Sequence, residues 1–534
     1  MSGLFDNRND GKARREERSK KEQTSKRKHS RLTVTVVVVL LVVFIGAITI
    51  NSNFIRRSAT AITIGGRAFT AAEFDYFYNF GISEYTGFIN EQMPPEFASA
   101  MLPVRGQLLS DQIQDPETGA TWADFFRERA ETSISQLVSL YNAANASGFV
   151  MSEEDIVAME EAIDMQLMQA DWAVMNGHVR TPAEYLQLMY GSSMNEAVLR
   201  DIFQFIFTAI SYRDNVRESF TYTQAELEAF YLENSNQLDV FRYRILLVTP
   251  EVQNPMDFET GDELYAAQET ALEETVALAQ LFADTITSEE AFIEVARGFD
   301  EVLFSDPRST LAMVQGEALD PTFADWLTDG ARVYGDTMTF EAVNGTHVLF
   351  FVDRDDNNYH LTSMRQILLM RENVFPEDFP EGEDDPGFIA EMARVDQVAR
   401  ERGLAALAAL EAGGGTEARL IELMEEHSDD HVPGGLYENI AMFPYESETG
   451  RLMTIVPELE EWLFDESRQI GDFELIRTEA FGYHLMFFAG RGEIFRDFIA
   501  DDRMRTNDHR DWSDALPEVE APRRHWGFIL TTTN

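Results

Sequence analysis

The 534-residue sequence contains no cysteine. The chain therefore has no disulfides and no thiol chemistry, and its stability must come from packed cores alone. Three common catalytic motifs are also absent: the G-x-S-x-G nucleophile turn, the G-x-x-x-x-G-K-[ST] phosphate loop and the H-E-x-x-H zinc motif. The sequence thus gives no indication of the hydrolase, nucleotide-binding or metalloprotease classes that these motifs mark.

Basic residues are scarce and unevenly placed. The chain has 43 Lys and Arg against 93 Asp and Glu, for a net charge of −50. Residues 1–32 hold eleven of the Lys and Arg and only five acids, so they carry +6 and the rest of the chain carries −56. Such an acidic body argues against nucleic acid or an anionic membrane surface as a partner, and is compatible with cationic or unfolded polypeptides. A basic head that binds nucleic acid is the alternative for residues 1–32.

One long apolar run follows the basic head. Val34–Ile50 contains no charged residue and approaches the roughly 20 residues that a spanning helix needs. Because positive charge beside such a segment stays in the cytoplasm, the pattern predicts a single-pass cell-membrane protein with a cytoplasmic N-terminus and an extracytoplasmic body. A cleaved signal peptide is the alternative, but the basic region and the apolar run are both longer than is usual for one.

The extracytoplasmic part, of almost 480 residues, is too long for one core and suggests about three domains. Its first part reads as a short hairpin at Ala61–Phe69 followed by helices with apolar residues at helical spacing. Seven methionines between Met151 and Met194 could adapt to varied apolar clients, or could simply pack between helices. Capping pairs that start helices are predicted at Thr70 with Glu73, Ser193 with Glu196, and Thr223 with Glu226.

An internal duplication follows. Residues 240–354 and 360–490 each open on a strand that contains Ile-Leu-Leu, and each closes on G-[TY]-H-[VL]-x-F-F. Between these ends lie helical segments, so each copy predicts a compact antiparallel sheet wrapped by helices, an α+β design. Matching the two Ile-Leu-Leu runs pairs Arg244 with Gln366, and the closing motifs pair His347 with His484.

The second copy resembles a parvulin-type peptidyl-prolyl isomerase domain. The resemblance is carried by the strand Arg365–Leu368, the segment HSDDHVPGGL at His427–Leu436, the helix-like Pro457–Phe464 and the closing Gly482–His484. With the hairpin and helices upstream, the exported part is similar to SurA/PrsA/PpiD-like foldases. The charge pattern and the apolar run predict a basic cytoplasmic head (1–32) and a transmembrane helix (33–51), and the mixed composition at the end of the chain predicts a C-terminal tail (491–534). Between them, the resemblance implies a helical SurA/PrsA-like chaperone domain (58–239), a degenerate parvulin-like module (240–354) and a parvulin-like isomerase module (360–490).

The resemblance also implies site residues. His484 stands at the closing histidine of the family, Asp430 at its acidic position, and Gln366 where the family has its first histidine. Leu459 and Met453 would line the proline slot. The alternatives are an ordinary hydrogen-bonded sheet histidine for His484 and plain core packing for Leu459 and Met453.

The first copy departs further from the family pattern. Arg244 would replace the first histidine, and no Gly-Gly turn follows Ser305-Asp306. We therefore expect residues 240–354 to be inactive.

Rotation about an X–Pro amide breaks no bond, so the predicted reaction needs neither a cofactor nor a metal. His427 and His431 lie beside two aspartates, but a metal site needs three or four convergent ligands, and the adjacent Pro-Gly-Gly favours a loop. The sequence thus predicts a membrane-anchored extracytoplasmic foldase with prolyl isomerase activity toward unfolded or proline-containing exported polypeptides. The alternatives are a non-catalytic holdase that uses the same modules to bind extended chains, and a structural ectodomain with no client.

Overall fold

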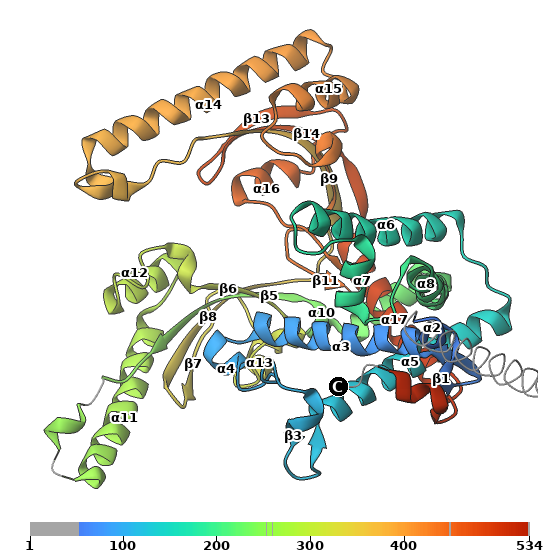
Figure 1. Ribbon diagram of the computed structural model, residues 1–534. Coiled ribbons are helices and arrows are strands. Elements are labelled where there is room, and N and C mark those ends of the chain that lie inside the picture. Colours follow the sequence, from blue (N-terminus) through green and yellow to red (C-terminus); the bar gives the residue numbers. More distant parts are fainter. Residues whose placement is uncertain (1–52, 252–253, 259, 448–449, 532–534) are drawn as a thin grey trace, which may run out of the picture. The chain divides into compact units, whose positions relative to one another are not determined.

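The computed structural model describes residues 53–531 apart from 252–253, 259 and 448–449, and it has an α+β fold, as predicted (Figure 1). The basic head and the predicted transmembrane run Val34–Ile50 lie outside the described residues. Among the residues that are described, no helix is both long enough and apolar enough to cross a membrane. The chain divides into two compact units, one made of Met1–Ser219 with His509–Asn534 and the other of Phe220–Asp508.

Unit 1 combines a small sheet with long helices. The predicted hairpin is formed by β1 (Thr60–Ile64) and β2 (Arg67–Thr70), and the C-terminal β15 (Arg523–Arg524) pairs with the other edge of β1. Aromatic side chains dominate its core, among them Phe69, Phe126 and Phe205. The remaining elements are α2 (Phe54–Ser58), α3 (Ala71–Gln92), α4 (Pro95–Ala98), β3 (Ile113–Asp115), β4 (Ala120–Thr121), α5 (Trp122–Ser147), α6 (Glu153–Met175), α7 (Pro182–Tyr190) and α8 (Glu196–Ser219).

Two of the three predicted helix caps are confirmed. Thr70 with Glu73 and Thr223 with Glu226 both form reciprocal capping boxes. The third prediction is wrong: α8 begins at Glu196, so the N-cap is Asn195, whose side-chain oxygen accepts a hydrogen bond from the backbone N–H of Val198 at 3.0 Å. Ser193 is buried two residues further upstream.

Unit 2 contains two four-stranded antiparallel sheets of identical topology. The first has the order β6 (Leu311–Gln315), β5 (Val240–Val248), β8 (Gly345–Asp355), β7 (Thr337–Ala342). The second has the order β10 (Leu436–Ile440), β9 (His360–Met370), β14 (Gly482–Ile494), β13 (Phe473–Thr478). In each, the strand that opens the module lies beside the strand that closes it. The helices are α9 (Gln224–Glu233), α10 (Ser235–Leu238), α11 (Gly261–Thr285), α12 (Glu289–Phe299), α13 (Ala324–Thr328), α14 (Pro386–Ala412), α15 (Glu417–His427), α16 (Pro457–Leu463) and the start of α17 (Phe495–Asp514).

Alternation along the strands gives each sheet two apolar faces. In the second sheet, Ile367 and Leu485 pack against α14 and α15, whereas Met364 and Met486 pack against α16 on the opposite face. Figure 1 shows α14 and α16 on opposite sides of this sheet. The first sheet is arranged in the same way, with α11 and α12 on one face and α13 on the other. Gln366 and His484 have the same parity as Met364 and Met486, so they lie on the α16 face.

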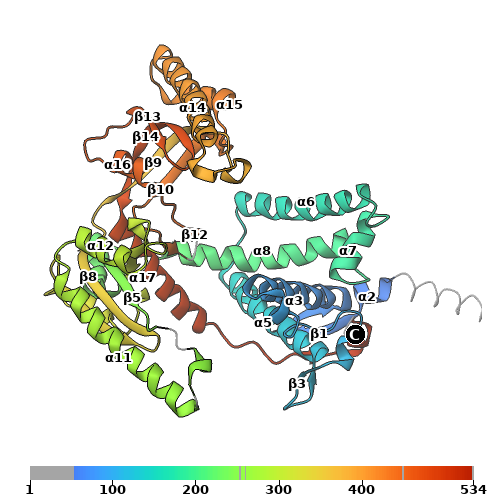
Figure 2. The same cartoon turned by 90° about the vertical axis from the view of Figure 1, so that its left-hand side faces the viewer.

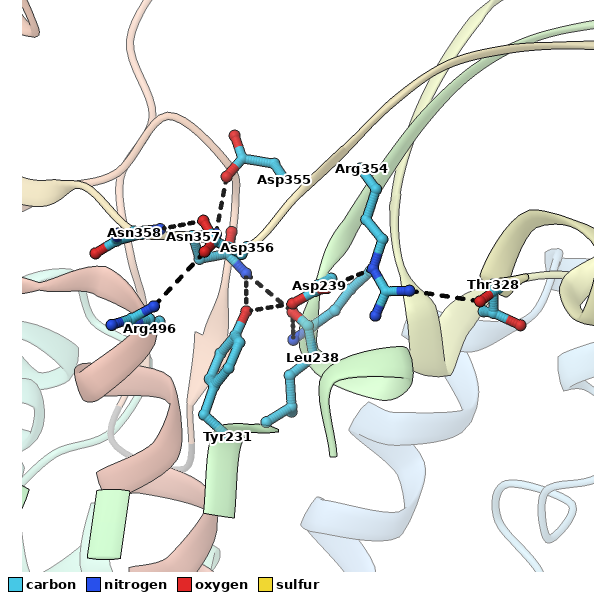
Figure 3. A network of polar contacts seen from close by, with 11 residues as sticks. Tyr231, Leu238, Asp239, Thr328, Arg354, Asp355, Asp356, Asn357, Asn358 and Arg496 are labelled. Atoms are coloured by element: carbon cyan, nitrogen blue, oxygen red, sulfur yellow. Dashed lines mark hydrogen bonds and ion pairs between the residues drawn. The ribbon is translucent and has the colours of Figure 1, made fainter. Parts of the chain in front are cut away.

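A buried polar network holds the short linker between the two sheets, residues 356–359, which joins β8 to β9 (Figure 3). Arg354 Nε donates to Asp239 Oδ2 at 2.5 Å, and the hydroxyl of Tyr231 donates to Asp239 Oδ1 at 2.8 Å. Asn357, which has a φ of 54°, donates from Nδ2 to the Tyr231 hydroxyl at 2.9 Å, and its carbonyl accepts from the backbone N–H of Arg496 at 3.0 Å. The linker is thereby tied to α9 on one side and to α17 on the other.

Candidate functional site

A continuous chain of hydrogen bonds joins all three predicted catalytic residues on the α16 face of the second sheet. Gln366 in β9 donates from Nε2 to Asp430 Oδ2 at 3.0 Å, and its Oε1 lies 2.9 Å from His484 Nδ1 in β14. On the other side of the ring, His484 Nε2 lies 3.0 Å from the hydroxyl of Thr478, the last residue of β13. The register places Gln366 opposite Met486, two residues beyond His484, so the two side chains meet diagonally across adjacent strands.

The carboxylate at one end of this series of hydrogen bonds fixes the direction of every bond in it. An ionised carboxylate can only accept, so the amide nitrogen of Gln366 faces Asp430 and the amide oxygen faces His484. His484 therefore carries its proton on Nδ1, and its Nε2 accepts from the Thr478 hydroxyl. Thr478 Oγ1 in turn accepts from the backbone N–H of Phe481 at 3.4 Å. The amide of Gln366 thus supplies one donor and one acceptor, as a neutral imidazole would.

Burial sets the charge states. His484 is only 4% exposed, and burial lowers its pKa to about 4 against the smaller opposing effect of Glu458 and Asp430. Burial also opposes ionisation of Asp430, but hydrogen bonds from Tyr437, from the backbone N–H of Val432 and from Gln366 hold its pKa below the usual range. The site therefore combines a neutral imidazole with an ionised carboxylate at neutral pH.

The HSDDHVPGGL segment anchors the carboxylate along β9. Ser428 Oγ accepts from the backbone N–H of Leu368 at 3.1 Å, which fixes the residues just before Asp430. Asp429 accepts from the backbone N–H of Met370 at 2.8 Å and forms a two-pronged ion pair with Arg402 at 2.8 and 2.9 Å. Neither aspartate is thus arranged as a metal ligand, and the residues that the structure describes include no group of three His, Cys, Asp or Glu side chains that could hold a metal ion.

The Gly-Gly turn needs glycine because of its backbone conformation and because it passes close to β9. Gly434 and Gly435 have φ values of 59° and 56°, which favour glycine. A Cβ on Gly435 would lie 2.6 Å from the carbonyl oxygen of Gln366 and 2.3 Å from Met424 Sδ. The turn therefore lets the loop pass directly over the strand that carries Gln366.

The two predicted slot residues have different surroundings. Leu459 in α16 is 3% exposed and packs against Met486 and Phe488, so it supports the site's face from within the core. Met453 is 46% exposed and lies outside any regular element. Phe481 is an exposed apolar side chain that contacts the site: it is 42% exposed, and its ring lies edge-on to that of His484 with 6.2 Å between the ring centroids.

Thr478, Tyr437 and Phe481 were not predicted from the sequence. Tyr437 directly follows the Gly-Gly-Leu turn, and Phe481 directly precedes the Gly-Tyr-His motif, so both lie beside recognised segments. Thr478 is brought to His484 by the hairpin register, in which it lies opposite Gly482. Adjacency to the motifs was the signal in the sequence that could have indicated Tyr437 and Phe481.

In the first sheet, the register overturns the predicted match between Arg244 and Gln366. His347 lies opposite Leu247, as His484 lies opposite Leu368. Ile245 lies two residues before Leu247, and Gln366 lies two residues before Leu368. Ile245, not Arg244, therefore occupies in the first sheet the position that Gln366 occupies in the second.

Arg244 is instead the counterpart of Arg365. Arg244 Nε donates to Glu289 in α12 at 2.8 Å, and Arg365 Nε donates to Glu417 in α15 at 2.6 Å. Both guanidinium groups also donate to a backbone carbonyl in the loop after the helix, that of Pro307 at 2.8 Å in the first module and that of Gly434 at 2.5 Å in the second. The duplicated modules thus share a structural arginine.

His347 lacks, among the described residues, the hydrogen bond at Nδ1 that His484 forms with Gln366. Its Nδ1 is buried and has no hydrogen-bond partner among the described residues, and its ring lies 5.9 Å from that of Phe323. Burial lowers the pKa of His347, so it too is neutral.

Comparisons with known proteins give structural neighbours only. No protein-family model matches the chain, and no curated protein sequence matches it. Its structural neighbours include PrsA peptidyl-prolyl isomerases. The crystal structure of the peptidyl-prolyl isomerase PrsA from Bacillus anthracis shares 12% identity over 51% of this chain and 88% of its own, with a TM-score of 0.21. PrsA from Bacillus subtilis shares 13% identity over 59% of this chain and 90% of its own, with a TM-score of 0.14.

Proposed function

We propose that the protein is a foldase whose second module catalyses peptidyl-prolyl isomerisation in the manner of a parvulin. The observation that carries this proposal is the hydrogen-bond chain Asp430–Gln366–His484–Thr478, which joins the residues that the parvulin resemblance implies on one face of one sheet. The motifs from which the resemblance implied these positions are spread over 118 residues of the sequence.

The chemistry asked of such a site is modest. The barrier to rotation of a peptide bond, about 20 kcal/mol, comes from the partial double bond between carbon and nitrogen, which is lost when the amide twists. A site accelerates rotation by binding the twisted amide better than the planar one. It needs an apolar surface for the proline ring and fixed polar groups that do not reorganise.

The described residues supply both requirements. Phe481 offers an exposed aromatic face beside His484, where a proline ring can pack. The imidazole is held in one tautomer by Gln366 and Thr478, so its orientation is set before substrate arrives. The ionised Asp430, itself fixed by Tyr437 and Val432, anchors the far end of the chain.

Refolding of a substrate protein limited by a proline isomerisation tests this function. Uncatalysed, such a phase takes tens to hundreds of seconds. At concentrations well below that of the substrate, the protein should shorten the slow phase in proportion to its own concentration. A slow phase that is unchanged at every concentration would refute catalysis.

A non-catalytic holdase is the second candidate, and Ile245 favours it for the first module. With an isoleucine in place of the family's first histidine, that module keeps the sheet and helices but not the polar chain. Suppression of client aggregation with no change in the isomerisation rate would select the holdase.

We further infer that the body is held at the extracytoplasmic face of the cell membrane by Val34–Ile50. The support is the uncharged apolar run and the +6 head that precedes it. Membrane fractionation of cells that express the full chain, compared with a variant that lacks residues 1–52, tests this. The full chain should sediment with membranes and be cleaved by protease added outside the cell.

A further inference from the structure

The outward side of α6 in unit 1 carries a row of exposed apolar side chains along its length. Met159 and Ile163 face inward and are buried, so the opposite side of the helix is turned away from the unit's core. Figure 2 shows α6 lying alongside α8, on the far side of α8 from α3. The α6 outer face, as we name it, consists of side chains that are between 56% and 79% exposed: Val157, Met165, Met168, Trp172 and Met175.

Acidic residues lie along the same stripe. Helical spacing places Glu161, Asp164 and Asp171 between and beside the exposed methionines, and all three are exposed. α6 as a whole holds seven Asp and Glu and no Lys, Arg or His. Glu160 pairs with Arg200, but among the described residues no cation pairs with Glu161, Asp164 or Asp171. Apolar surface and uncompensated negative charge are therefore presented together.

We propose that the α6 outer face binds unfolded polypeptide segments in which apolar side chains stand next to lysine or arginine. This inference rests on the proposed foldase role and names the kind of client that unit 1 selects. Flexible thioethers suit varied apolar partners, and a tryptophan gives the stripe a large rigid anchor. The three free carboxylates add attraction for basic residues that flank the apolar ones.

The negative charge of the α6 outer face argues against two other partners, a second copy of this chain and an anionic lipid surface. A second copy of this chain would bring a body of −56 against an acidic stripe, and an anionic lipid surface would be repelled in the same way. The chain's own basic head, residues 1–32, has suitable charge and is an occupant that the experiment must test.

Peptide binding to the full chain, followed by fluorescence anisotropy, tests the proposal. The probes are two labelled, unstructured, proline-free peptides with the same leucines and phenylalanines, one interspersed with lysine and the other with glutamate. The wild-type protein should bind the lysine peptide about tenfold more tightly or better, and this preference should shrink as salt is raised.

Two sets of substitutions separate the apolar and the charged contributions. The triple variant Met165→Ser, Met168→Ser, Trp172→Ser should weaken binding of both peptides about tenfold or more, because exposed anchors are removed. The triple variant Glu161→Lys, Asp164→Lys, Asp171→Lys should reverse the preference toward the glutamate peptide. All six residues are exposed, so unfolding midpoints should stay close to that of the wild type.

A matched control changes charge elsewhere by the same amount. Glu269→Lys, Glu273→Lys and Glu274→Lys alter three exposed acids of α11 in unit 2. The control should keep the lysine-peptide preference. The proposal is overturned if the control loses that preference as fully as the α6 variants do, or if the α6 variants bind like the wild type. Tighter peptide binding on deletion of residues 1–52 would also overturn it, because the head would then be the occupant.

Isomerisation of a short X–Pro tetrapeptide by the wild-type protein separates this inference from the proposed function. No acceleration, together with charge-selective binding that depends on α6, would contradict the isomerase and leave the client face standing. Acceleration without such binding would contradict the client face alone.

Discussion

Ile245 in the first sheet of unit 2 occupies the position that Gln366 holds in the second. Ile245 lies two residues before Leu247, which is opposite His347. Gln366 lies two residues before Leu368, which is opposite His484. Gln366 links its histidine to a carboxylate, whereas the side chain of Ile245 cannot form a hydrogen bond. The Nδ1 of His347 is accordingly buried without a partner among the described residues. The duplication has therefore produced two sheets of equal topology with different chemistry.

Replacing Gln366 should separate its hydrogen bonding from its size. Gln366→Leu removes the donor to Asp430 and the acceptor for His484, so we expect a loss of about 1–3 kcal/mol in the free energy of unfolding and a fall in isomerisation of tenfold or more. Gln366→His keeps one donor and one acceptor and adds the second imidazole that the parvulin resemblance implies beside His484, so it should raise the isomerisation rate above that of the wild type. Urea unfolding and a tetrapeptide assay measure the two effects. An unchanged rate in Gln366→His would show that the glutamine does not limit activity.

His484 should make stability depend on pH between about 4 and 6.5. Its pKa is about 4 in the folded protein against 6.5 for an ordinary histidine, so within this range the unfolded chain binds a proton that the native protein does not. The free energy of unfolding therefore rises with pH across the range, and acidification from pH 6.5 to 4 should cost up to about 3 kcal/mol.

The difference between wild type and His484→Gln isolates this contribution, because other groups titrate equally in both. The variant should show a shallower slope between pH 4 and 6.5. Parallel curves for the two proteins would contradict the buried neutral imidazole.

The ion pair between Arg354 and the buried Asp239 should contribute far more to the free energy of unfolding than a neighbouring, more exposed ion pair. Asp239 is buried, so Arg354→Met would leave a carboxylate without its charged partner at a cost of about 3–5 kcal/mol. Arg242 in β5 and Asp353 in β8 form a nearby pair at 2.7 Å, but their side chains are 38% and 43% exposed, so Arg242→Met should cost less than about 1 kcal/mol. Urea unfolding of the two variants measures the contrast, and equal losses would refute it.

Local patterns in the sequence predicted the local structure well. The hairpin, the two capping boxes and the α+β class depend on residues a few positions apart, and all are confirmed. The failed cap at Ser193 shows the limit of such patterns, because Asn195 lies two residues closer to the helix and accepts the hydrogen bond from the backbone N–H of Val198 in the first turn.

The match between Arg244 and Gln366 failed for a reason specific to sheets. Aligning identical Ile-Leu-Leu letters shifts one strand by a single residue, and a one-residue shift moves every side chain to the opposite face. In the structure, Leu246 faces α11 and α12 as Ile367 faces α14 and α15, which fixes the true match. The pairing of β15 with β1, between segments more than 450 residues apart, had no local signal at all.

The motifs in the sequence indicated three members of the hydrogen-bond chain, and the members that the fold alone supplies were missed. His484, Gln366 and Asp430 were found from motifs, and the structure brings them into contact. Thr478 joins them through the hairpin register, and Tyr437 through the path of the loop after the Gly-Gly turn.

Prolyl isomerisation of a tetrapeptide by matched histidine variants tests the central claim most directly. His484→Ala and His347→Ala remove equivalent residues from the two sheets, and circular dichroism would check that both variants remain folded. We predict that His484→Ala reduces the rate enhancement about tenfold or more, as loss of a polar group from a preorganised site does, whereas His347→Ala leaves it at the wild-type level. Full activity in His484→Ala, or an equal loss in both variants, would contradict the assignment of catalysis to the second module.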